Sequence, residues 1–257
     1  MALELVNNLP YDHPYRWDGT AVGGQKLWRP DELGASLALW LDAEDTASIT
    51  LNGSTVSQWD DKSGNDRHVS QATAAAQPSY QTTGLNGKPA LAWGAVANSK
   101  FLKATAVTNY SPKRFFGVAD YDGSDPFSNF VTVFSHDVVV SQDFLRSNNT
   151  GTSWVNVNPV FQNGSSASTL VALPEISNPF VFSTDYEQTA NRPNIWIGSD
   201  RAITDRSWKG NISEVIALSV VPTAEIKQQI EGYLAWKWGL TANLPVSHPY
   251  KTTPPTA

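Results

Sequence analysis

The 257-residue sequence contains no cysteine, and Met1 is its only methionine. Without cysteine there is no disulfide framework, no thiolate zinc site and no cysteine nucleophile. The longest apolar runs are far shorter than the roughly 20 residues that span a bilayer. The first residues also lack the basic and apolar regions of a Sec signal. We therefore expect no membrane partner, and we expect either assembly in the cytoplasm or a sequence that is already a mature form.

Charge of one sign is not concentrated anywhere in the chain. The sequence has 18 Lys and Arg against 24 Asp and Glu, a net charge of −6 at pH 7, with no basic stripe. Nucleic-acid binding needs clustered Lys and Arg to neutralise phosphates. Nucleic acid is therefore not an expected partner, and the mild acidity mainly favours solubility.

Short segments rich in Val, Ile, Phe, Trp and Thr follow one another from residue 37 onward, separated by turn residues. Asn52-Gly53 between two such segments is the commonest hairpin signal. The segment NISEVIALSV, residues 211–220, is predicted to be a largely buried strand because Ile212, Val215, Ile216 and Leu218 are apolar. Many short strands at this spacing predict an all-β sandwich or barrel. Four tryptophans within strands are predicted core residues: Trp40, Trp59, Trp93 and Trp196.

One segment near the C-terminus has a helical pattern. Ile226, Ile230, Leu234 and Trp238 recur at i+4 steps, which predicts an amphipathic helix. Thr223 is the expected N-cap, and Gly239 is placed where a C′ glycine belongs. Gly232 lies in the middle of this helix, where glycine costs about 1 kcal/mol against alanine. We expect it to mark a close approach to a sheet.

Two similar peptides flank the β-rich region. NLPYDHPY at residues 8–15 and NLPVSHPY at residues 243–250 share six of eight letters, and a basic residue follows each. Proline fixes φ and removes a donor, so each peptide is stiff. We interpret them as two docking arms whose anchors are Leu9, His13, Tyr15, Leu244, His248 and Tyr250. The alternative is that residues 1–20 are the remnant of a preceding repeat.

Several motifs resemble a known superfamily. Leu41-Asp42-Ala43, the segment from Trp59 to Asn65, and Asn86-Gly87-Lys88-Pro89 resemble the opening of bacterial and phage laminin-G-like domains of the concanavalin A-like lectin/glucanase superfamily. The segments WIGSD, WKGNISEVIALS and IEGYLAWKWGL resemble the last strands and the closing helix of the same family. The trailing NLPVSHPYK resembles the C-terminal tails of tailed-phage and marine viral structural proteins. The resemblance covers roughly residues 37–250, without a motif match in about 105–190.

This resemblance implies an all-β fold: a concanavalin A-like jelly-roll β-sandwich with one C-terminal α-helix and extended N- and C-terminal arms. The expected division is an arm at residues 1–36, a laminin-G-like domain at 37–240 and a Pro-rich arm at 241–257. For function it is less specific, because this sandwich carries lectins, hydrolases, lyases and structural modules.

Catalytic patterns are sparse. The glucanase branch places Glu-x-Asp-x-Glu on one strand so that three carboxylates share a groove, and the sequence has no such triplet. Asp42 and Asp45 are read as turn caps. A Ser-His-Asp triad stays open because His13, His68, His136 and His248 exist, but no Gly-x-Ser-x-Gly elbow accompanies them. We expect a protein that is not an enzyme and needs no cofactor.

Two acidic loops are candidates for Ca²⁺, which prefers six to eight oxygen ligands. They contain Asp120, Asp122 and Asp125, and Asp60, Asp61, Asn65 and Asp66. Neither has EF-hand spacing. We favour side chains that bond their own backbone in tight turns, with Ca²⁺ as the alternative.

Aromatic residues near loops are candidates for stacking on sugar rings. Tyr121, Trp154, Tyr186 and Trp208 are the predicted carbohydrate-binding residues, with Phe127 as a further loop aromatic, although buried aromatics dominate ordinary cores. The favoured function is a non-enzymatic virion structural module of a tailed phage: a capsid-decorating, fibre or tail-associated protein. Its expected partners are other virion proteins or itself as a homo-oligomer, and cell-surface glycan. The alternative is a lectin-like adhesin assisted by Ca²⁺, and a polysaccharide hydrolase or lyase is least favoured.

Overall fold

The computed structural model describes residues 26–94, 100–121, 130–136, 144–147, 154–155, 160–166, 178–185, 190–201 and 206–257. Within these residues lie one α-helix, α1 (Ala224–Lys237), and four 3-10 helices, η1 (Pro30–Ser36), η2 (Thr46–Ser48), η3 (Ala74–Ala76) and η4 (Thr241–Asn243). The strands are β1 (Leu37–Asp42), β2 (Ile49–Asn52), β3 (Thr55–Trp59), β4 (Val69–Ser70), β5 (Ser79–Leu85), β6 (Lys88–Gly94), β7 (Leu102–Ala104), β8 (Arg114–Ala119), β9 (Thr132–Ser135), β10 (Phe144–Ser147), β11 (Trp154–Val155), β12 (Val160–Gln162), β13 (Ser165–Ser166), β14 (Phe180–Asp185), β15 (Ile195–Ile197) and β16 (Gly210–Leu218).

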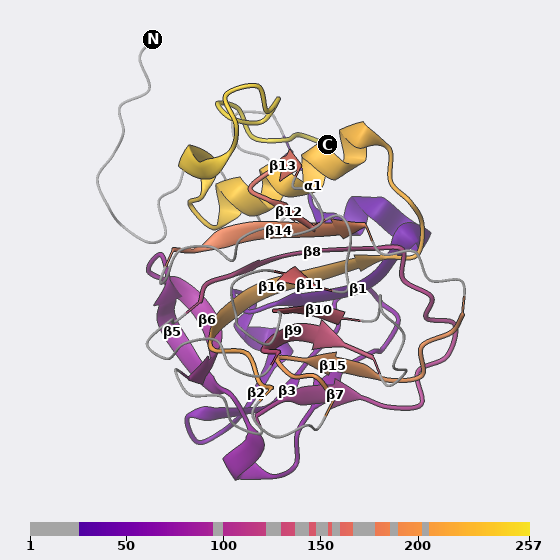
Figure 1. Ribbon diagram of the computed structural model, residues 1–257, viewed down its shortest axis with the longest axis vertical. Coiled ribbons are helices and arrows are strands. Elements are labelled where there is room, and N and C mark those ends of the chain that lie inside the picture. Colours follow the sequence, from indigo (N-terminus) through magenta and orange to yellow (C-terminus); the bar gives the residue numbers. More distant parts are fainter. Residues whose placement is uncertain are drawn as a thin grey trace.

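The strands form one antiparallel sheet that curls over itself into two layers (Figure 1). Its order is β11-β10-β9-β15-β7-β4-β3-β5-β6-β16-β8-β14-β12-β13, with β1 paired to β16 and β2 paired to β3. Strands β2 and β3 are the predicted hairpin, and Asn52 pairs with Thr55 across a two-residue turn in which Gly53 has φ +65°. The predicted all-β sandwich of jelly-roll type is confirmed.

The main apolar core fills the space between the two layers. Side chains alternate along the central strands, as the period of two requires. On β8, Phe115 and Ala119 belong to this inner core, and Phe116 and Val118 face the other way. All four strand tryptophans predicted as core are buried, and Trp59 and Trp93 have no exposed surface.

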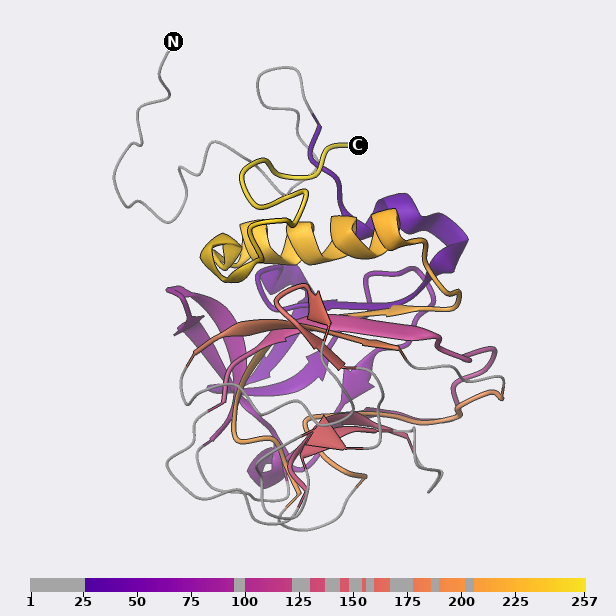
Figure 2. The same ribbon diagram turned by 45° about the horizontal axis from the view of Figure 1, so that its top comes forward.

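Helix α1 covers the outer face of the layer that contains β14, β8 and β16 (Figure 2). A second apolar cluster lies beneath it, with Ile230, Leu234 and Trp238 on the helix side. The Thr223 side chain accepts from the backbone N–H of Ile226, and Gly239 follows the helix with φ +71°. The predicted helix, its N-cap and its C-terminal glycine are therefore confirmed.

The two ends of the described chain lie beside α1. Leu27 pairs with Thr256, and the backbone N–H of Ala257 donates to the carbonyl of Lys26. Trp28 is buried and meets Tyr233 edge-on at 5.8 Å between ring centroids. Residues 26–36 of the predicted arm thus pack against the body, and residues 1–25 lie outside the described residues. No helix in the described part of the chain has the length and apolarity to cross a membrane.

Candidate functional site

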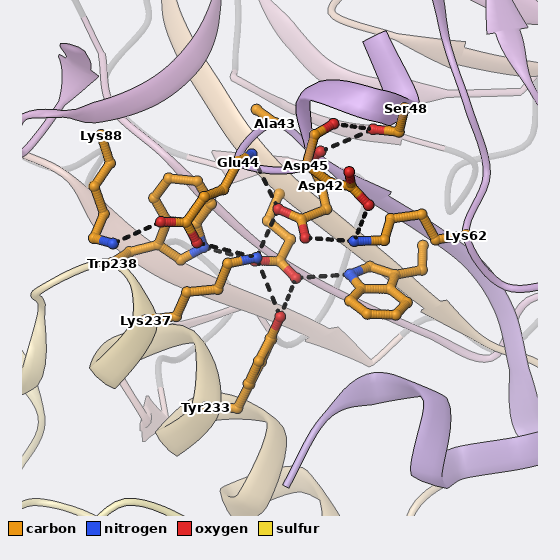
Figure 3. A network of polar contacts seen from close by, with 12 residues as sticks. Asp42, Ala43, Glu44, Asp45, Ser48, Lys62, Lys88, Tyr233, Lys237 and Trp238 are labelled. Carbon is orange, nitrogen blue, oxygen red and sulfur yellow. Dashed lines mark hydrogen bonds and ion pairs between the residues drawn. The ribbon is translucent and has the colours of Figure 1, made fainter. Parts of the chain in front are cut away.

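A buried cluster of charged groups lies between the sheet and α1 (Figure 3). Asp42 comes from the end of β1, Glu214 from the middle of β16, and Lys237 from the last turn of α1. The Lys237 Nζ lies 2.6 Å from Asp42 Oδ1 and 2.9 Å from Glu214 Oε2. The first strand β1, strand β16 and helix α1 are therefore joined by one ammonium group.

Glu214 accepts four hydrogen bonds, two at each carboxylate oxygen. Oε1 receives the indole N–H of Trp40 and the hydroxyl of Tyr233, each at 2.8 Å. Oε2 receives Lys237 and the indole N–H of Trp238, the latter at 2.6 Å. Buried carboxylates persist only when such donors replace water, and this set satisfies Glu214 completely.

Asp42 connects the buried cluster to charged side chains nearer the surface. Its Oδ2 lies 2.9 Å from Lys62 Nζ, which also lies 2.8 Å from Asp45 Oδ2. Its Oδ1 accepts the backbone N–H of Glu44, whose own carboxylate pairs with Lys88 at 2.8 Å. Acidic and basic groups alternate from the buried Lys237 to the half-exposed loop after β1, as Figure 3 shows.

The electrostatics of the cluster follow from burial and from Lys237. Burial alone would raise the pKa of Asp42, but Lys237 and Lys62 outweigh it and lower that pKa to about 2. Burial would lower the pKa of Lys237, and Asp42 and Glu214 raise it instead. Burial, together with the nearby Asp42, raises the pKa of Glu214 against the opposing effect of Lys237. Asp42 and Lys237 therefore form a charged pair at neutral pH.

This cluster is closed to solvent. Glu214 has no exposed surface, and Lys237 and Asp42 are buried with it. A polymer could not reach these carboxylates, so the arrangement fastens α1 to the sheet. The predicted cap role of Asp45 is confirmed, since its Oδ1 accepts the N–H of Ala47, whereas Asp42 does more than cap a turn. Sequence reasoning missed Glu214 and Lys237; the signal was a glutamate inside an otherwise apolar strand.

The C-terminal peptide lies against the outer side of α1 and the β12–β13 turn. Leu244 is buried in the apolar cluster under the helix. His248 Nδ1 accepts the N–H of Tyr250, which leaves the ring proton on Nε2, 3.5 Å from Glu231 Oε2. Glu231 also accepts the Ser183 hydroxyl at 2.7 Å. Of the predicted docking anchors, Leu244, His248 and Tyr250 thus contact the body, and Leu9, His13 and Tyr15 lie outside the described residues.

Two further contacts fix the end of this peptide. The Trp236 indole N–H donates to the carbonyl of Tyr250 at 2.8 Å. The Lys251 ammonium donates to three carbonyls in the connection after α1, those of Thr241, Ala242 and Leu244. The segment after α1 is therefore folded back on the helix, although the sequence predicted an extended arm.

Gly232 has a different role from the one expected. A Cβ at this position would lie 2.6 Å from Tyr250 Cβ and 2.8 Å from Tyr250 Cγ. The missing side chain makes room for the C-terminal peptide, and the expected contact with a sheet was wrong. The C-terminal half of α1 is therefore covered on both its sheet-facing and its outward side, and residues 230–235 are all buried.

An open pocket of ≈ 350 Å³ lies at the other end of the sandwich, between the loop 65–68 and the segment 103–108. Arg67 lines the pocket, and its guanidinium donates to the carbonyls of Ala38, Thr108 and Asn109. His68 Nδ1 accepts the N–H of Asp61. The Lys103 ammonium lies 5.1 Å from the centroid of the Trp196 ring, and no carboxylate among the described residues pairs with it. Among the described residues of the lining, two cations, Arg67 and Lys103, stand against one carboxylate, Asp66.

Of the predicted carbohydrate-binding aromatics, the two that the structure describes, Tyr121 and Trp208, do not line this pocket. Tyr121 and Trp208 have no exposed surface, and they meet edge-on at 5.6 Å inside the core. The Trp208 indole N–H donates to the carbonyl of Asp120. A covered ring offers no face to a sugar, so in this structure both are core residues. Trp154 begins β11 but its side chain lies outside the described residues, as do Tyr186 and Phe127.

The acidic loops behave as turns where they are described. Asp61 accepts the backbone N–H groups of Trp40, Ser63 and Arg67. Asp120 accepts both the N–H and the side-chain amide of Asn211, while Asp122 and Asp125 lie outside the described residues. Across the described ranges, no three His, Asp or Glu side chains gather in a way that could hold a metal ion. Backbone bonding by the 60–66 loop, as predicted, is confirmed.

The histidines do not assemble a catalytic triad within the described residues. His136 is fully buried between the sheets, its Nδ1 2.8 Å from the carbonyl of Asn194. Burial lowers its pKa to about 4, which keeps it neutral. His68 and His248 each accept a backbone N–H.

No protein-family model and no curated protein matches this chain. Two solved structures are similar in fold. Domain 4 of AbnA, a GH43 extracellular arabinanase from Geobacillus stearothermophilus in complex with arabinotriose, has a TM-score of 0.42 and 11% identity over 74% of this chain and 95% of that chain. A GH54 α-L-arabinofuranosidase soaked with a cyclic sulfate inhibitor has a TM-score of 0.37 and 11% identity over 77% of this chain and 58% of that chain. Similarity this low transfers neither ligand nor activity to this chain.

Proposed function

We propose that this protein is a non-enzymatic virion structural module that binds an acidic glycan in the pocket between residues 65–68 and 103–108. The observation that carries the glycan part is the lining of that pocket. It combines Arg67, Lys103 and His68 with the hydroxyl-bearing Ser70, Thr105 and Thr108, and it is open to solvent. Saccharides present many hydroxyls, and an acidic saccharide adds a carboxylate or sulfate that pairs with fixed cations.

Lys103 is the residue on which selectivity for an acidic sugar depends in this proposal. Its ammonium is held over the Trp196 ring and has no carboxylate partner among the described residues. Arg67 is committed to three backbone carbonyls and shapes the pocket. A ligand carboxylate or sulfate would therefore meet Lys103 first, without breaking an existing ion pair.

The non-enzymatic part is supported by the pocket lining, in which Asp66 is the single carboxylate among the described residues, and by the placement of four other described carboxylates. Asp42 and Glu214 are sealed under α1 by Lys237 and the neighbouring indoles. Asp61 and Asp120 are committed to backbone N–H groups. A retaining or inverting glycosidase needs two carboxyl groups that face the sugar. Incubation with a polysaccharide panel should release no reducing ends; release that survives purification would contradict this part.

The glycan part is tested with an array of neutral, uronate-bearing, sialylated and sulfated glycans, followed by calorimetry on the strongest binder. We expect acidic glycans to bind, and we expect Lys103→Ala to weaken binding about tenfold, or ~1.4 kcal/mol. Lys103→Arg should keep most of the affinity. Lys227→Ala removes a cation from α1, away from the pocket, and is the matched control. Equal binding of neutral glycans, or no effect of Lys103→Ala, would overturn the proposal.

The virion part is supported by the resemblance of the trailing peptide NLPVSHPYK to the C-terminal tails of tailed-phage and marine viral structural proteins. It predicts assembly, either with itself or with other particle proteins. Native mass spectrometry of the full chain at micromolar concentration should show a defined oligomer, or binding to a purified capsid or tail protein. A monomer that binds no particle component would count against the virion setting and leave the glycan proposal standing.

A further inference from the structure

The C-terminal peptide, residues 243–251, shows which positions of the repeated motif are buried against the body of the protein and which are exposed. Residues 243–251 and 8–16 differ in type at two positions only, Val246 against Tyr11 and Ser247 against Asp12, apart from the exchange of one basic residue for another. In the docked peptide both positions are exposed, and Val246 is 93% exposed. Leu244 and His248, which are buried, are identical in the other copy. The two differences in residue type thus fall on exposed positions of the docked peptide.

We propose that residues 8–16 bind the same site on α1, in exchange with residues 243–251. The site requires a leucine in the apolar cluster, an imidazole opposite Glu231, an aromatic ring over Gly232 and a basic residue at the end. Leu9, His13, Tyr15 and Arg16 supply these groups in the same order and spacing. The hydrogen bond from Trp236 goes to a backbone carbonyl, which any residue provides.

The length of chain before Lys26 allows this exchange within one molecule. In the docked arm, six residues lead from Lys251 to Ala257, whose N–H donates to the carbonyl of Lys26. Six residue steps are therefore enough to span the distance from the position of Lys251, at the end of the site, to Lys26. Residues 8–16 have ten residue steps from Arg16 to Lys26, which reach up to about 35 Å when extended.

Engineered cysteine pairs test the proposal in the full chain, which has no native cysteine to interfere. Glu231→Cys is combined either with His248→Cys, the docked pair, or with His13→Cys, the proposed alternative. The native side chains of the docked pair meet at their tips, with 3.5 Å between Glu231 Oε2 and His248 Nε2, whereas a disulfide needs Cβ atoms within about 4.5 Å. A short bismaleimide that reacts with both thiols therefore replaces direct oxidation. We expect it to cross-link both pairs, and we expect the product of the second pair to migrate as a monomer.

The matched control is Glu231→Cys with Asp12→Cys. Asp12 has almost the same tether length as His13, but it corresponds to the exposed Ser247. Specific docking predicts cross-linking several-fold faster at position 13 than at position 12, and slower cross-linking when a synthetic peptide of residues 243–251 is added. Equal rates at both positions would overturn the proposal. A cross-linked dimer would also overturn it, because the occupant would then come from a second copy.

A non-covalent measurement avoids any change at Glu231. A dye-labelled peptide of residues 6–18 is titrated against the Tyr250→Ala chain, in which the C-terminal copy has lost its contact with Gly232. We expect fluorescence anisotropy to show saturable binding. Replacing Tyr11 and Asp12 of the peptide by alanine should change its affinity little, whereas replacing His13 and Tyr15 should abolish binding. Binding that ignores all four replacements, or no binding of the parent peptide, contradicts the proposal.

Discussion

The two faces of strand β16 are buried by different means. On one face, Val215 and Ala217 join the apolar core between the sheet layers. On the other, Glu214 collects four donors from β1 and α1, beside Ile216 and Leu218. Apolar packing is non-directional, whereas the bonds to Glu214 have fixed geometry. The inner face thus holds two layers together, and the outer face sets where the helix lies.

The largest effect should come from breaking the outer face. Lys237→Ala leaves Asp42 and Glu214 buried without their cation, and removing one partner of a buried ion pair costs about 3–5 kcal/mol of unfolding free energy. Urea unfolding at pH 7, followed by circular dichroism, measures this loss. Replacing Asp42, Glu214 and Lys237 together by Asn, Gln and Met should recover part of the stability. A cost below about 1 kcal/mol for Lys237→Ala would show that the cluster does not hold the helix.

A substitution on the inner face should also lower the free energy of unfolding, but through lost apolar packing and not through an unpaired charge. Leu39 lies on β1 next to Trp40, but it points into the core between the layers. Leu39→Ala removes buried methyl groups and leaves a cavity, which costs about 3 kcal/mol. Leu51 is 49% exposed on β2, and Leu51→Ala is the control expected to change stability by less than about 0.5 kcal/mol. If Leu39→Ala were equally mild, the inner layer would not be close-packed.

The inner face was predictable because period and composition report it directly. Strands with alternating or continuous apolar residues and the Asn52-Gly53 hairpin are local patterns. The outer face was not predictable, since the partners of Glu214 come from β1 and α1. The fold-back of residues 243–251 onto Gly232 was missed for the same reason: a mid-helix glycine shows that something approaches, but not what.

Aromatic residues show a second limit. Tyr121 and Trp208 follow strand-like segments and lie near turn residues, which suggested exposed loop positions. In the structure they cover each other inside the core. The pocket that the structure contains is lined instead by Arg67, His68 and Lys103. Their common location depends on the pairing of β4 with β7, which places Ser70 beside Lys103. That pairing has no local sequence signal.

Lowering the pH should destabilise the inner core and the outer-face cluster in two different pH ranges. In the inner core, burial lowers the pKa of His136 from an ordinary 6.5 to about 4. As the pH falls, the unfolded chain therefore protonates this histidine before the folded chain does, and the free energy of unfolding decreases between pH 6.5 and 4. On the outer face, the pKa of Asp42 falls from 3.8 to about 2, so its contribution of about 2 kcal/mol is lost between pH 4 and 2.

Thermal unfolding from pH 7 to 2 measures both windows. His136→Gln should flatten the dependence between pH 6.5 and 4 without changing the lower window. Asp42→Asn should be less stable than the parent at pH 7, and this difference should shrink between pH 4 and 2. A difference that stays constant down to pH 2 would contradict the charged pairing of Asp42 with Lys237.

The smallest expected effect lies at the start of α1, outside both cores. The Thr223 hydroxyl accepts the N–H of Ile226 at 3.3 Å, and Thr223→Ala should cost about 1 kcal/mol through the loss of this cap. Thr223→Ser keeps the hydroxyl and should cost less than half as much. Because Lys237 fastens the other end of the helix, the cap matters only if the first turn can fray independently. Hydrogen exchange at Ile226 and Lys227 should therefore rise in Thr223→Ala, while exchange near Lys237 stays unchanged. Faster exchange along the whole helix would mean that α1 opens as one unit and that the ion cluster does not anchor its C-terminal end separately.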